Sequence, residues 1–424
     1  MATSIKKIVA ASLIGTTIEW YDFFLYGSAA ALVFNKLFFP DSEPLTGTLL
    51  SFLTYAVGFV ARPLGGLVFG HFGDRVGRKT LLVVSLLMMG TATFLIGCLP
   101  TYETLGPAAA LVLTALRLVQ GFALGGEWGG AVLIVSEHGD TARRGFWASW
   151  PQAGAPGGNL LATGVLAVLA ALQPDETFLA WGWRVPFLLS GVLVLIGLWI
   201  RLTISESPVF QAAPPEPRAP IVGVLRHHAK DVVVAIGARL AENISFYLLT
   251  VFVITYTKQS GVDDSTVLNA VLVSSAIHFV TIPMWGALSD RVGRRPLYLG
   301  GAAGIGVWIF AFFPMVGTGN FWVITLAVTV GLLFHGMMYG PQAAFFSELF
   351  GTRTRYTGVS IGAQLSAIVA GALAPIIAVA LLRDFGSSLP ISLYLALAAV
   401  LTLAAVYAAR ETRGSDLAER ITTR

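Results

Sequence analysis

Charged residues are scarce in this sequence. Of its 424 residues, only 12% are Asp, Glu, Lys or Arg, whereas soluble globular proteins carry about 25%. Hydrophobic residues make up 55% of the chain, and the mean hydropathy is +0.76. So little polar surface cannot cover a soluble particle of 45.0 kDa. The composition therefore excludes an ordinary soluble fold, a disordered chain and a nucleic-acid-binding protein.

Cysteine and the motifs of several enzyme classes are also lacking. Cys98 is the single cysteine, which excludes an internal disulfide and a cysteine-based metal cluster. No GxxxxGK[ST] segment is present, so the chain does not use ATP directly through a P-loop. No His and Cys residues have metal-ligand spacing, and no Ser, His and Asp set stands out. We therefore expect no catalytic residues, no metal and no cofactor.

Long apolar runs, in contrast, are abundant. A helix that crosses a bilayer needs about 20 mostly apolar residues. The period-two alternation of a membrane β-barrel is absent. The sequence predicts twelve spans, which lie near 8–34, 45–72, 80–99, 107–137, 146–171, 183–203, 231–257, 265–289, 297–317, 320–347, 358–382 and 388–410.

The positive charges are distributed unevenly between the two sides of these spans. Most of the 27 Lys and Arg residues fall on the side of the N-terminus. The other side holds Lys36, Arg184, Lys258 and Arg383, and three arginines lie within spans. Because Lys and Arg collect in cytoplasmic loops, we expect both termini to be cytoplasmic. The first span carries Glu19 and Asp22 and is long, so we interpret it as a helix rather than as a signal peptide.

An internal repeat divides the chain into halves. The segment 70–80 reads GHFGDRVGRKT, and 286–296 reads GALSDRVGRRP, about half the chain later. Weaker matches pair Glu137 and Arg144 with Glu348 and Arg355, and Glu19 with Glu242. Because each half has an even number of spans, both halves enter the membrane from the same face. A parallel repeat of this kind suits a transporter whose site lies between the halves.

The repeat also predicts the domain organisation. We expect an N-terminal six-helix bundle at 1–203 and a C-terminal six-helix bundle at 231–410. The segment 204–230 contains APPEPRAP, which is typical of a linker, and we place it in the cytoplasm. The remainder, 411–424, has mixed charge and is expected to be a solvated cytoplasmic tail.

Several motifs resemble those of a known family. GDRVGRK, its copy SDRVGRR and RLVQG at 117–121 are similar to signatures of the major facilitator superfamily. More narrowly, the chain resembles the metabolite:proton symporter branch, and within it the bacterial shikimate transporter type. The strings that carry this second resemblance are EWYDFFLYG, RPLGG, GGEWGG, WGWRVPF, SELFGTRTRYTG and ARLAENISFY. The resemblance implies an all-α integral membrane protein with twelve transmembrane helices in two parallel-repeat bundles, and uptake driven by a proton gradient across a bacterial inner membrane.

Charges inside the spans are costly, so we expect them to face a cavity or one another. Glu19 and Asp22 share a helix face, with Tyr26 one turn further. Two carboxylates this close cannot both ionise cheaply, so one is expected to carry a proton. Our hypothesis is that this acid, preferably Asp22, alternates between its proton and Arg117 and so drives transport. The alternative is a static buried ion pair. Glu127 is either a second protonation site or a structural acid.

The second half contributes a further charged pair. Arg239 and Glu242 are three residues apart on one face, as an intrahelical ion pair requires. Alternatively, Arg239 binds a substrate carboxylate, and with Arg117 or Arg62 it places cations on both sides of a central cavity. Neutral or titratable candidates for the same cavity are Gln152, Asn159, Tyr247, His335, Gln342 and Gln364, with His278 as a further titratable group. Each of these is equally interpretable as a contact between helices.

The repeated loop motif predicts a cytoplasmic gate. In the first copy, Asp74 is expected to cap a helix end and to pair with an arginine when that side is shut. Such a pair is a two-state element of the kind that alternating access requires. The expected gate residues are Asp74, Arg75, Arg78, Asp290, Arg291, Arg294, Glu137, Arg144, Glu348 and Arg355. The alternative is that these charges only fix the topology.

These observations together predict a secondary transporter. We expect it to import a shikimate-like or other small organic acid by proton symport, as a monomer in the lipid bilayer. A zwitterionic osmolyte such as proline or betaine is the alternative substrate, and a membrane-embedded enzyme is a remote alternative function. Symport inward and antiport outward use the same parts, so the direction of transport stays open at this point.

Overall fold

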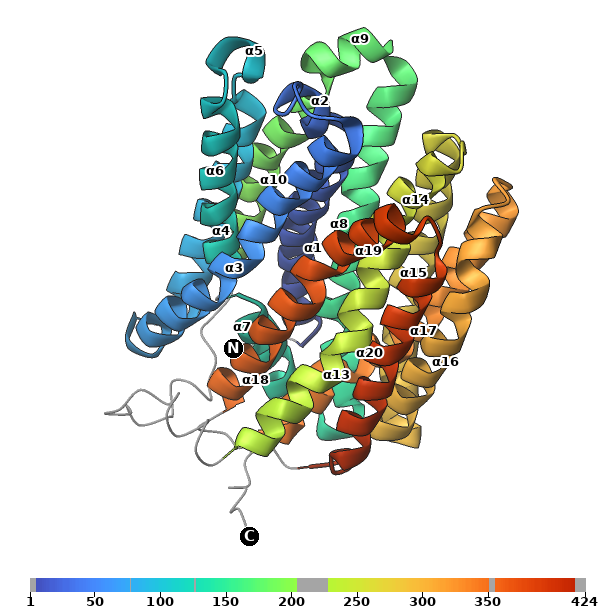
Figure 1. The fold of residues 1–424 in the computed structure, drawn as a ribbon. Coiled ribbons are helices and arrows are strands. Elements are labelled where there is room, and N and C mark those ends of the chain that lie inside the picture. Colours follow the sequence, from blue (N-terminus) through green and yellow to red (C-terminus); the bar gives the residue numbers. More distant parts are fainter. Residues whose placement is uncertain (1–4, 77, 126, 204–227, 351–354, 416–424) are drawn as a thin grey trace.

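The computed structural model describes residues 5–76, 78–125, 127–203, 228–350 and 355–415 (Figure 1), and within them it is helical without a strand. The first half begins with α1 (Ile5–Ala29), which runs into the π-helical turn η1 (Ala30–Phe34). Its other elements are α2 (Asn35–Leu37), α3 (Pro44–Val76), α4 (Arg78–Cys98), α5 (Tyr102–Leu105), α6 (Ala108–Gly125), α7 (Glu127–His138), η2 (Thr141–Arg143), α8 (Arg144–Leu172), α9 (Asp175–Thr177), η3 (Phe178–Gly182) and α10 (Arg184–Thr203).

The second half repeats this pattern. It starts with α13 (Ala229–Tyr247), which continues through the π-helical turn η4 (Leu248–Phe252) into α14 (Val253–Gln259). The following helices are α15 (Asp264–Val292), α16 (Arg294–Val316) and α17 (Phe321–Leu349). The next span consists of α18 (Arg355–Ser366), the π-helical segment η5 (Ala367–Ala372) and α19 (Leu373–Phe385), and α20 (Leu389–Ala408) is last.

Each of the twelve predicted spans corresponds to helix in this structure. Ten described segments are long and apolar enough to cross a membrane, and the bent pair Asp175–Gly182 and Arg184–Ile200 makes an eleventh. The exception is α8, whose first half carries Gln152, Asn159 and several Gly and Pro residues. The fourth span comprises α6 and α7, on either side of residue 126, which lies outside the described residues.

The two halves stand side by side, with α1 to α10 in blue to green and α13 to α20 in yellow to red (Figure 1). Helix α8 packs closely on α1, because a Cβ on Gly158 would meet the backbone of Trp20 and Tyr21. The same helix reaches α15 of the other half, where Asn159 Nδ2 donates to Ser275 Oγ at 3.0 Å. A helix packed on both halves needs little lipid-facing apolar surface, which explains its lower hydropathy.

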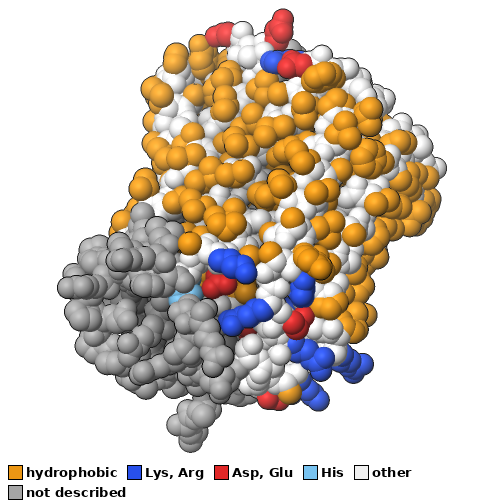
Figure 2. All heavy atoms as spheres, turned by 60° about the horizontal axis from the view of Figure 1, so that its bottom comes forward, with side chains coloured by type: hydrophobic (Ala, Val, Ile, Leu, Met, Phe, Trp, Pro, Cys, Tyr) orange, Lys and Arg blue, Asp and Glu red, His pale blue; other side chains and the backbone are white. Residues whose placement is uncertain are grey.

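The outer wall of the molecule is apolar. Trp199, Val307 and Leu397 are 69%, 76% and 60% exposed, which suits contact with lipid chains rather than water. Lys and Arg side chains instead gather at one end, which Figure 2 brings forward. We call this the basic end. Hydrogen bonds join the start of α8, the end of α15, the start of α16 and the segment after α20 there, and these segments carry Arg143, Arg144, Arg291, Arg294, Arg295, Arg410 and Arg413.

Glycine allows α3 and α6 to touch at the backbone. A Cβ on Gly121 would overlap the carbonyl oxygen of Gly58, and a Cβ on Gly65 would overlap that of Phe122. Contacts between small residues are a main source of helix association in membranes, where no hydrophobic effect drives helices together. This close approach also lets the side chain of Arg117 on α6 occupy the space that a side chain at Gly58 on α3 would fill.

We predict that Gly121→Val destabilises the protein, because the added methyl groups have no space beside Gly58. Overpacking of this kind costs about 1–3 kcal/mol or more. Thermal unfolding of the detergent-purified protein, followed by tryptophan fluorescence, should show a lower midpoint. Gly164→Ala is the matched control, since its nearest neighbour, Leu272, lies at an ordinary 4.0 Å from the added Cβ position. Equal midpoints for the two variants would contradict the prediction.

Candidate functional site

Arg117 lies buried at the centre of the first half, on α6. Its Nη1 donates to Oε1 of Gln120 at 3.0 Å, and its Nε donates to the backbone oxygen of Tyr55 at 3.5 Å. The guanidinium carbon lies 4.4 Å and 4.7 Å from the ring centres of Tyr26 and Tyr55. Aromatic faces attract cations, so these rings partly replace the water that the guanidinium has lost.

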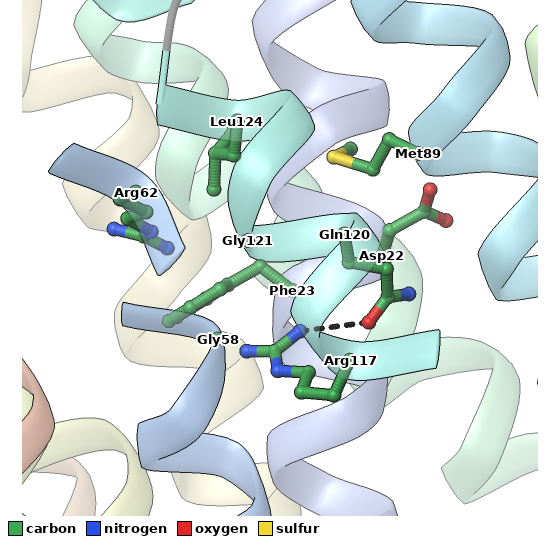
Figure 3. Close-up of a pocket in the computed structure, with 9 residues that line it drawn as sticks. All are labelled: Asp22, Phe23, Gly58, Arg62, Met89, Arg117, Gln120, Gly121 and Leu124. Atoms are coloured by element: carbon green, nitrogen blue, oxygen red, sulfur yellow. Dashed lines mark hydrogen bonds between the residues drawn. The ribbon is translucent and has the colours of Figure 1, made fainter. Parts of the chain in front are cut away.

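Arg62 on α3 is a second buried cation beside it. Its guanidinium carbon lies 4.2 Å from the ring centre of Phe59 and 4.8 Å from that of Phe23. Phe23 is also 5.1 Å from Arg117, and Figure 3 shows its ring between the two arginines. Nε of Arg62 makes no hydrogen bond with the part of the chain that the structure describes.

Asp22 on α1 faces the same pocket as both arginines (Figure 3). It is 1% exposed, and among the described residues neither of its carboxyl oxygens has a hydrogen-bond partner. Arg117 bonds to Gln120 instead, and Gln120 Nε2 donates to Thr93 Oγ1 at 2.7 Å. The direct Asp22–Arg117 contact that we expected is therefore not made in this conformation. A buried carboxyl without a partner favours its neutral, protonated form.

The pocket itself is small. Its cavity volume between α1, α3, α4 and α6 is about 10 Å³, far below the roughly 300–1,000 Å³ of typical small-molecule sites. Its wall includes Met89 and Leu124 next to the charged groups. In this conformation the centre of the first half therefore has room for about one water molecule at most and not for an organic acid.

Glu242 on α13 is the corresponding centre of the second half. It is 3% exposed, and its Oε2 accepts from Gln342 Nε2 at 3.1 Å and from Asn243 Nδ2 at 3.2 Å. Nε of Arg239 lies 3.6 Å from the same oxygen. Unlike Asp22, Glu242 is therefore surrounded by donors, which stabilise its ionised form.

Two histidines extend this network. His335 on α17 places Nε2 at 3.3 Å from Oε1 of Glu242, and its Nδ1 lies 3.0 Å from Nε2 of His278 on α15. Both imidazoles are 1% exposed. The ring of His335 also stacks on Phe246, with 4.9 Å between the ring centres. The glutamate and the two histidines thus form one continuous hydrogen-bonded row across three helices.

Aromatic rings join the two centres. The ring centre of Tyr247 on α13 lies 6.0 Å from that of Phe23 and 5.9 Å from that of Phe59. Phe246 meets Trp20 of α1 at 6.2 Å. Tyr247 is also within electrostatic range of all three central arginines, Arg62, Arg117 and Arg239. The arginines of both halves therefore lie around the contact of Tyr247 with Phe23 and Phe59.

The neutral polar candidates divide into two groups. His335, Gln342 and Tyr247 belong to the centre, as described above. The others cross between the halves, since Gln152 Nε2 donates to the backbone oxygen of Tyr339 at 3.4 Å and Gln364 Nε2 to that of Gly125 at 2.8 Å. Asn159 makes the contact to Ser275. In this conformation these three hold helices of opposite halves together.

A network of ion pairs closes the basic end. Nη1 of Arg144 on α8 lies 2.9 Å from Oε1 of Glu348 on α17. Arg294 contacts both Glu348, at 3.3 Å, and Asp290, at 2.7 Å. The carboxylate of Asp290 accepts from the backbone N–H groups of Gly145 and Phe146 at 2.8 Å and 2.9 Å. We call Arg144, Asp290, Arg294 and Glu348 the basic-end gate.

The described contacts of this gate cross between the halves. Within each half, we expected Glu137 with Arg144 and Glu348 with Arg355, but the side chains of Glu137 and Arg355 lie outside the described residues. Among the described residues, Arg144 of the first half binds Glu348 of the second. Asp290 caps the N-terminus of α8 across the same interface, where the helix dipole favours a carboxylate. Each of these contacts therefore has to break before the halves can separate at this end.

The segment after α20 strengthens the gate, although Glu411, Arg413 and Gly414 are exposed, as expected for a solvated tail. Thr412 is fully buried, and its Oγ1 donates to Oε2 of Glu348 at 2.8 Å. The backbone oxygen of Ser415 accepts from Arg144 at 2.9 Å. Glu411 accepts from the backbone N–H groups of Arg294 and Arg295, each at 3.0 Å. Residues 411–415 therefore tie α16, α17 and α8 together.

Some predicted residues cannot be placed. The side chains of Asp74, Arg75, Arg78, Glu127, Glu137 and Arg355 lie outside the described residues.

Glu19 is buried on α1, one turn before Asp22, at 3% exposure. Arg291 is exposed at the basic end, where its backbone oxygen accepts from Arg413.

Sequence reasoning missed several residues of the site. Gln120 belongs to the RLVQG motif and stands three residues after Arg117, so the helical spacing alone would have indicated their contact. Tyr298 lies in an apolar run, yet its hydroxyl donates to Ala238 O at 2.9 Å and lies 3.0 Å from Nε2 of Gln342. Nothing in its local sequence marks this role.

A family profile and individual relatives both match most of this chain. The sequence profile described as Major Facilitator Superfamily matches residues 12–375. The chain is 42% identical over 421 residues to the inner membrane metabolite transport protein YhjE of Escherichia coli K12, covering 97% of this chain and 96% of that one. It is 40% identical over 390 residues to the shikimate transporter of the same strain, covering 90% and 89%. The proline/betaine transporter of Salmonella typhimurium LT2 is 30% identical over 436 residues, covering 97% and 85%.

Solved structures share the fold. The proton:xylose symporter XylE bound to 6-bromo-6-deoxy-D-glucose superposes with a TM-score of 0.80 at 16% identity, over 98% of both chains. The inward-open conformation of XylE from Escherichia coli gives a TM-score of 0.71 at 18% identity, over 98% of both chains. At this identity the likeness concerns the fold alone.

We predict a pH-dependent contribution of Glu411 to stability. Partial burial raises the pKa of Glu411, but four backbone N–H groups outweigh it and hold the pKa below its ordinary value near 4.5. Its contribution is therefore fully present above about pH 4.5 and is lost as the pH falls through the lowered pKa. Glu411→Ala should lower stability at pH 7 by about 1 kcal/mol, as for a lost helix cap.

Thermal unfolding of the wild type and of Glu411→Ala, measured between pH 7 and pH 3.5, tests this prediction. The difference in midpoint should shrink as the solution becomes more acidic. Glu103→Ala, at the exposed helix α5, serves as the control and should match the wild type at pH 7. A difference that grows toward low pH would contradict the assignment.

Proposed function

The chain belongs to the major facilitator superfamily and is a multi-pass membrane transporter rather than an enzyme, and from this premise we propose that it imports a small organic acid together with protons. The proposed substrate is a shikimate-like carboxylate. The proposed location is a bacterial inner membrane, with both termini in the cytoplasm, and the proposed active form is a monomer. Transport proceeds by alternating access, with substrate bound between the two halves.

The observation that carries this proposal is the convergence of three buried arginines on Tyr247. Arg62 and Arg117 come from the first half and Arg239 from the second. A guanidinium matches a carboxylate with two parallel hydrogen bonds. Burying three cations around one aromatic contact is costly unless an anion visits the site. An organic acid supplies that anion, and the 40% identity to a shikimate transporter supports the same substrate class.

Proton coupling is assigned to Asp22 in this proposal. Its carboxyl is buried beside two arginines but makes no hydrogen bond with the described residues. The neutral form tolerates this setting, whereas the ionised form needs Arg117 as a partner. Loss of the proton would therefore draw Arg117 from Gln120 to Asp22 and change the packing of α1 against α6. Protonation and helix position are coupled through this exchange of partners.

The basic-end gate supplies the alternation between two open states. We assign the basic end to the cytoplasmic face, because positive residues collect there. In the conformation described here the gate is closed, with Arg144 on Glu348 and Asp290 on the N-terminus of α8. Release of substrate into the cytoplasm requires these contacts to break, while the opposite end closes.

A zwitterionic osmolyte is the second candidate substrate. A proline/betaine transporter is 30% identical over most of the chain. Aromatic rings such as Trp20 and Phe246 could bind a quaternary ammonium through cation–π contacts. The three arginines favour the organic acid, because a betaine brings its own cation into a site that is already positive.

Uptake by proteoliposomes tests this proposal. Purified protein is supplied with shikimate, α-ketoglutarate, citrate, proline and glycine betaine, with and without an imposed pH gradient that is acid outside. We expect accumulation of a carboxylate that collapses when a protonophore is added. Accumulation of betaine alone, or uptake indifferent to the gradient, would overturn the proposal.

We predict that Asp22→Asn separates coupling from transport. The amide mimics the protonated carboxyl, so exchange of labelled for unlabelled substrate should continue in the variant. Accumulation against a gradient should fall at least tenfold, because the side chain no longer exchanges a proton. Gradient-driven accumulation at the wild-type level in Asp22→Asn would contradict the assignment of Asp22.

We predict that Arg239→Gln weakens substrate binding. Loss of a charge-assisted hydrogen bond of about 1.5–3 kcal/mol corresponds to an increase of KM of roughly 10- to 100-fold. Arg383→Gln is the control, since Arg383 is exposed and contacts Asp384 at 2.8 Å away from the centre. A KM for the carboxylate that is unchanged in Arg239→Gln would remove this residue from the site.

A further inference from the structure

Glu242, His335 and His278 form a row of titratable groups joined by hydrogen bonds. Three helices, α13, α17 and α15, each contribute one titratable group, at successive distances of 3.3 Å and 3.0 Å. All three side chains are at most 3% exposed. A row of this kind is expensive to bury, and a purely structural contact between α15 and α17 would not need two imidazoles. We propose that these residues form a second proton-binding site, in the second half, that exchanges its proton as Arg239 passes from Glu242 to the substrate carboxylate.

The hydrogen bonds permit a complete transfer without leaving a charge behind. With Glu242 ionised and both rings neutral, His335 donates Nε2–H to Glu242, and His278 donates Nε2–H to Nδ1 of His335. A proton added at Nδ1 of His278 then displaces the Nε2 proton of His278 onto His335. His335 in turn passes its Nε2 proton to Glu242. Glu242 becomes a neutral acid, both rings stay neutral with exchanged tautomers, and each hydrogen bond persists in the reverse direction.

One end of the row is a ring nitrogen without a hydrogen-bond partner among the described residues, and the other end adjoins the positive charge of Arg239. Nδ1 of His278 has no hydrogen-bond partner among the described residues, so it is the atom that accepts the incoming proton. At the other end, Arg239 lies 3.6 Å from Glu242. Neutral Glu242 no longer attracts Arg239, which is then available to a carboxylate at the contact of Arg62 and Tyr247. This exchange rests on the function proposed above. It adds a competition between Glu242 and the substrate carboxylate for Arg239, and protonation of Glu242 favours the substrate.

The surroundings restrict where else the proton could reside. The other titratable or charged groups facing the row are Arg239 and Tyr247 from α13, Tyr298 from α16, Tyr339 from α17 and Arg62 from α3. From α8, Gln152 contributes a neutral amide to the backbone oxygen of Tyr339. The arginines keep their protons, and tyrosines are weaker acids than imidazolium or a carboxylic acid. Within the described surroundings, Glu242 and the two histidines are therefore the groups between which a proton can pass.

Glutamine substitutions test the row. Glu242→Gln and His335→Gln keep hydrogen-bonding groups at both positions but cannot pass a proton along the row. The control is His228→Gln, because His228 lies at the start of α13 and contacts Asp231 at 3.2 Å, outside the row. Each variant is first examined by size-exclusion chromatography in detergent, so that the comparison is between folded proteins.

The first measurement needs no substrate. Infrared difference spectra of the ligand-free wild type between pH 8 and pH 4 should contain a protonated-carboxyl band that disappears in Glu242→Gln, and the range extends below the ordinary pKa of a glutamate because the donors around Glu242 favour its ionised form. The band should shift or weaken in His335→Gln and stay unchanged in His228→Gln. Absence of any band that depends on Glu242, or a band indifferent to His335, would overturn the second proton site.

The second measurement uses proteoliposomes and shikimate, or the panel carboxylate that the wild type accumulates. His335→Gln should lose at least tenfold in accumulation driven by a pH gradient, and this loss should exceed its loss in exchange of labelled for unlabelled substrate, whereas His228→Gln should match the wild type in both. Accumulation equal to that of His228→Gln would overturn the coupling of the row to transport. If the wild type accumulates no carboxylate, the proposed function fails, and the infrared measurement still decides whether the row binds a proton.

Discussion

An arginine cannot shed its charge, and this constraint shapes the centre of the molecule. Three buried guanidinium groups converge on one aromatic contact between the halves. Each guanidinium has different partners. Arg117 contacts aromatic faces and a glutamine, Arg62 contacts aromatic faces, and Arg239 lies next to a carboxylate. In the function proposed above, a substrate carboxylate takes up part of this positive charge, and the buried acids and the ion pairs at the basic end control when it enters and leaves.

The two halves repeat their helices but not their chemistry. In the first half a carboxyl at Asp22 stands without a hydrogen bond beside the arginines, and aromatic rings carry the electrostatics. In the second half Glu242 is enclosed by donors, and histidines extend its network across three helices. In the function proposed above, this asymmetry gives the halves different roles. Asp22 exchanges a proton, whereas Glu242 competes with the substrate carboxylate for Arg239.

The amino-acid sequence predicts the helices of this protein and most of the buried charges, because hydrocarbon penalises each polar residue strongly enough to leave a pattern. It predicts partners less well, since these depend on the register between distant helices. The contact of Arg144 with Glu348 of the other half, for example, does not follow from the sequence. Gln120 was visible from its spacing, whereas Tyr298 and the segment 411–415 were not, because their contacts are made only after the helices have assembled.

The wide turn η4, Leu248–Phe252, directly follows Phe246 and Tyr247. A π turn holds an extra residue compared with an α turn, and each residue of an α-helix turns the chain by about 100°. The extra residue therefore offsets the rotational register of α14 relative to α13. Phe246 and Tyr247 can thus face Phe23, Phe59 and Trp20 of the first half, while Tyr256 of α14 packs on Phe313 of its own half.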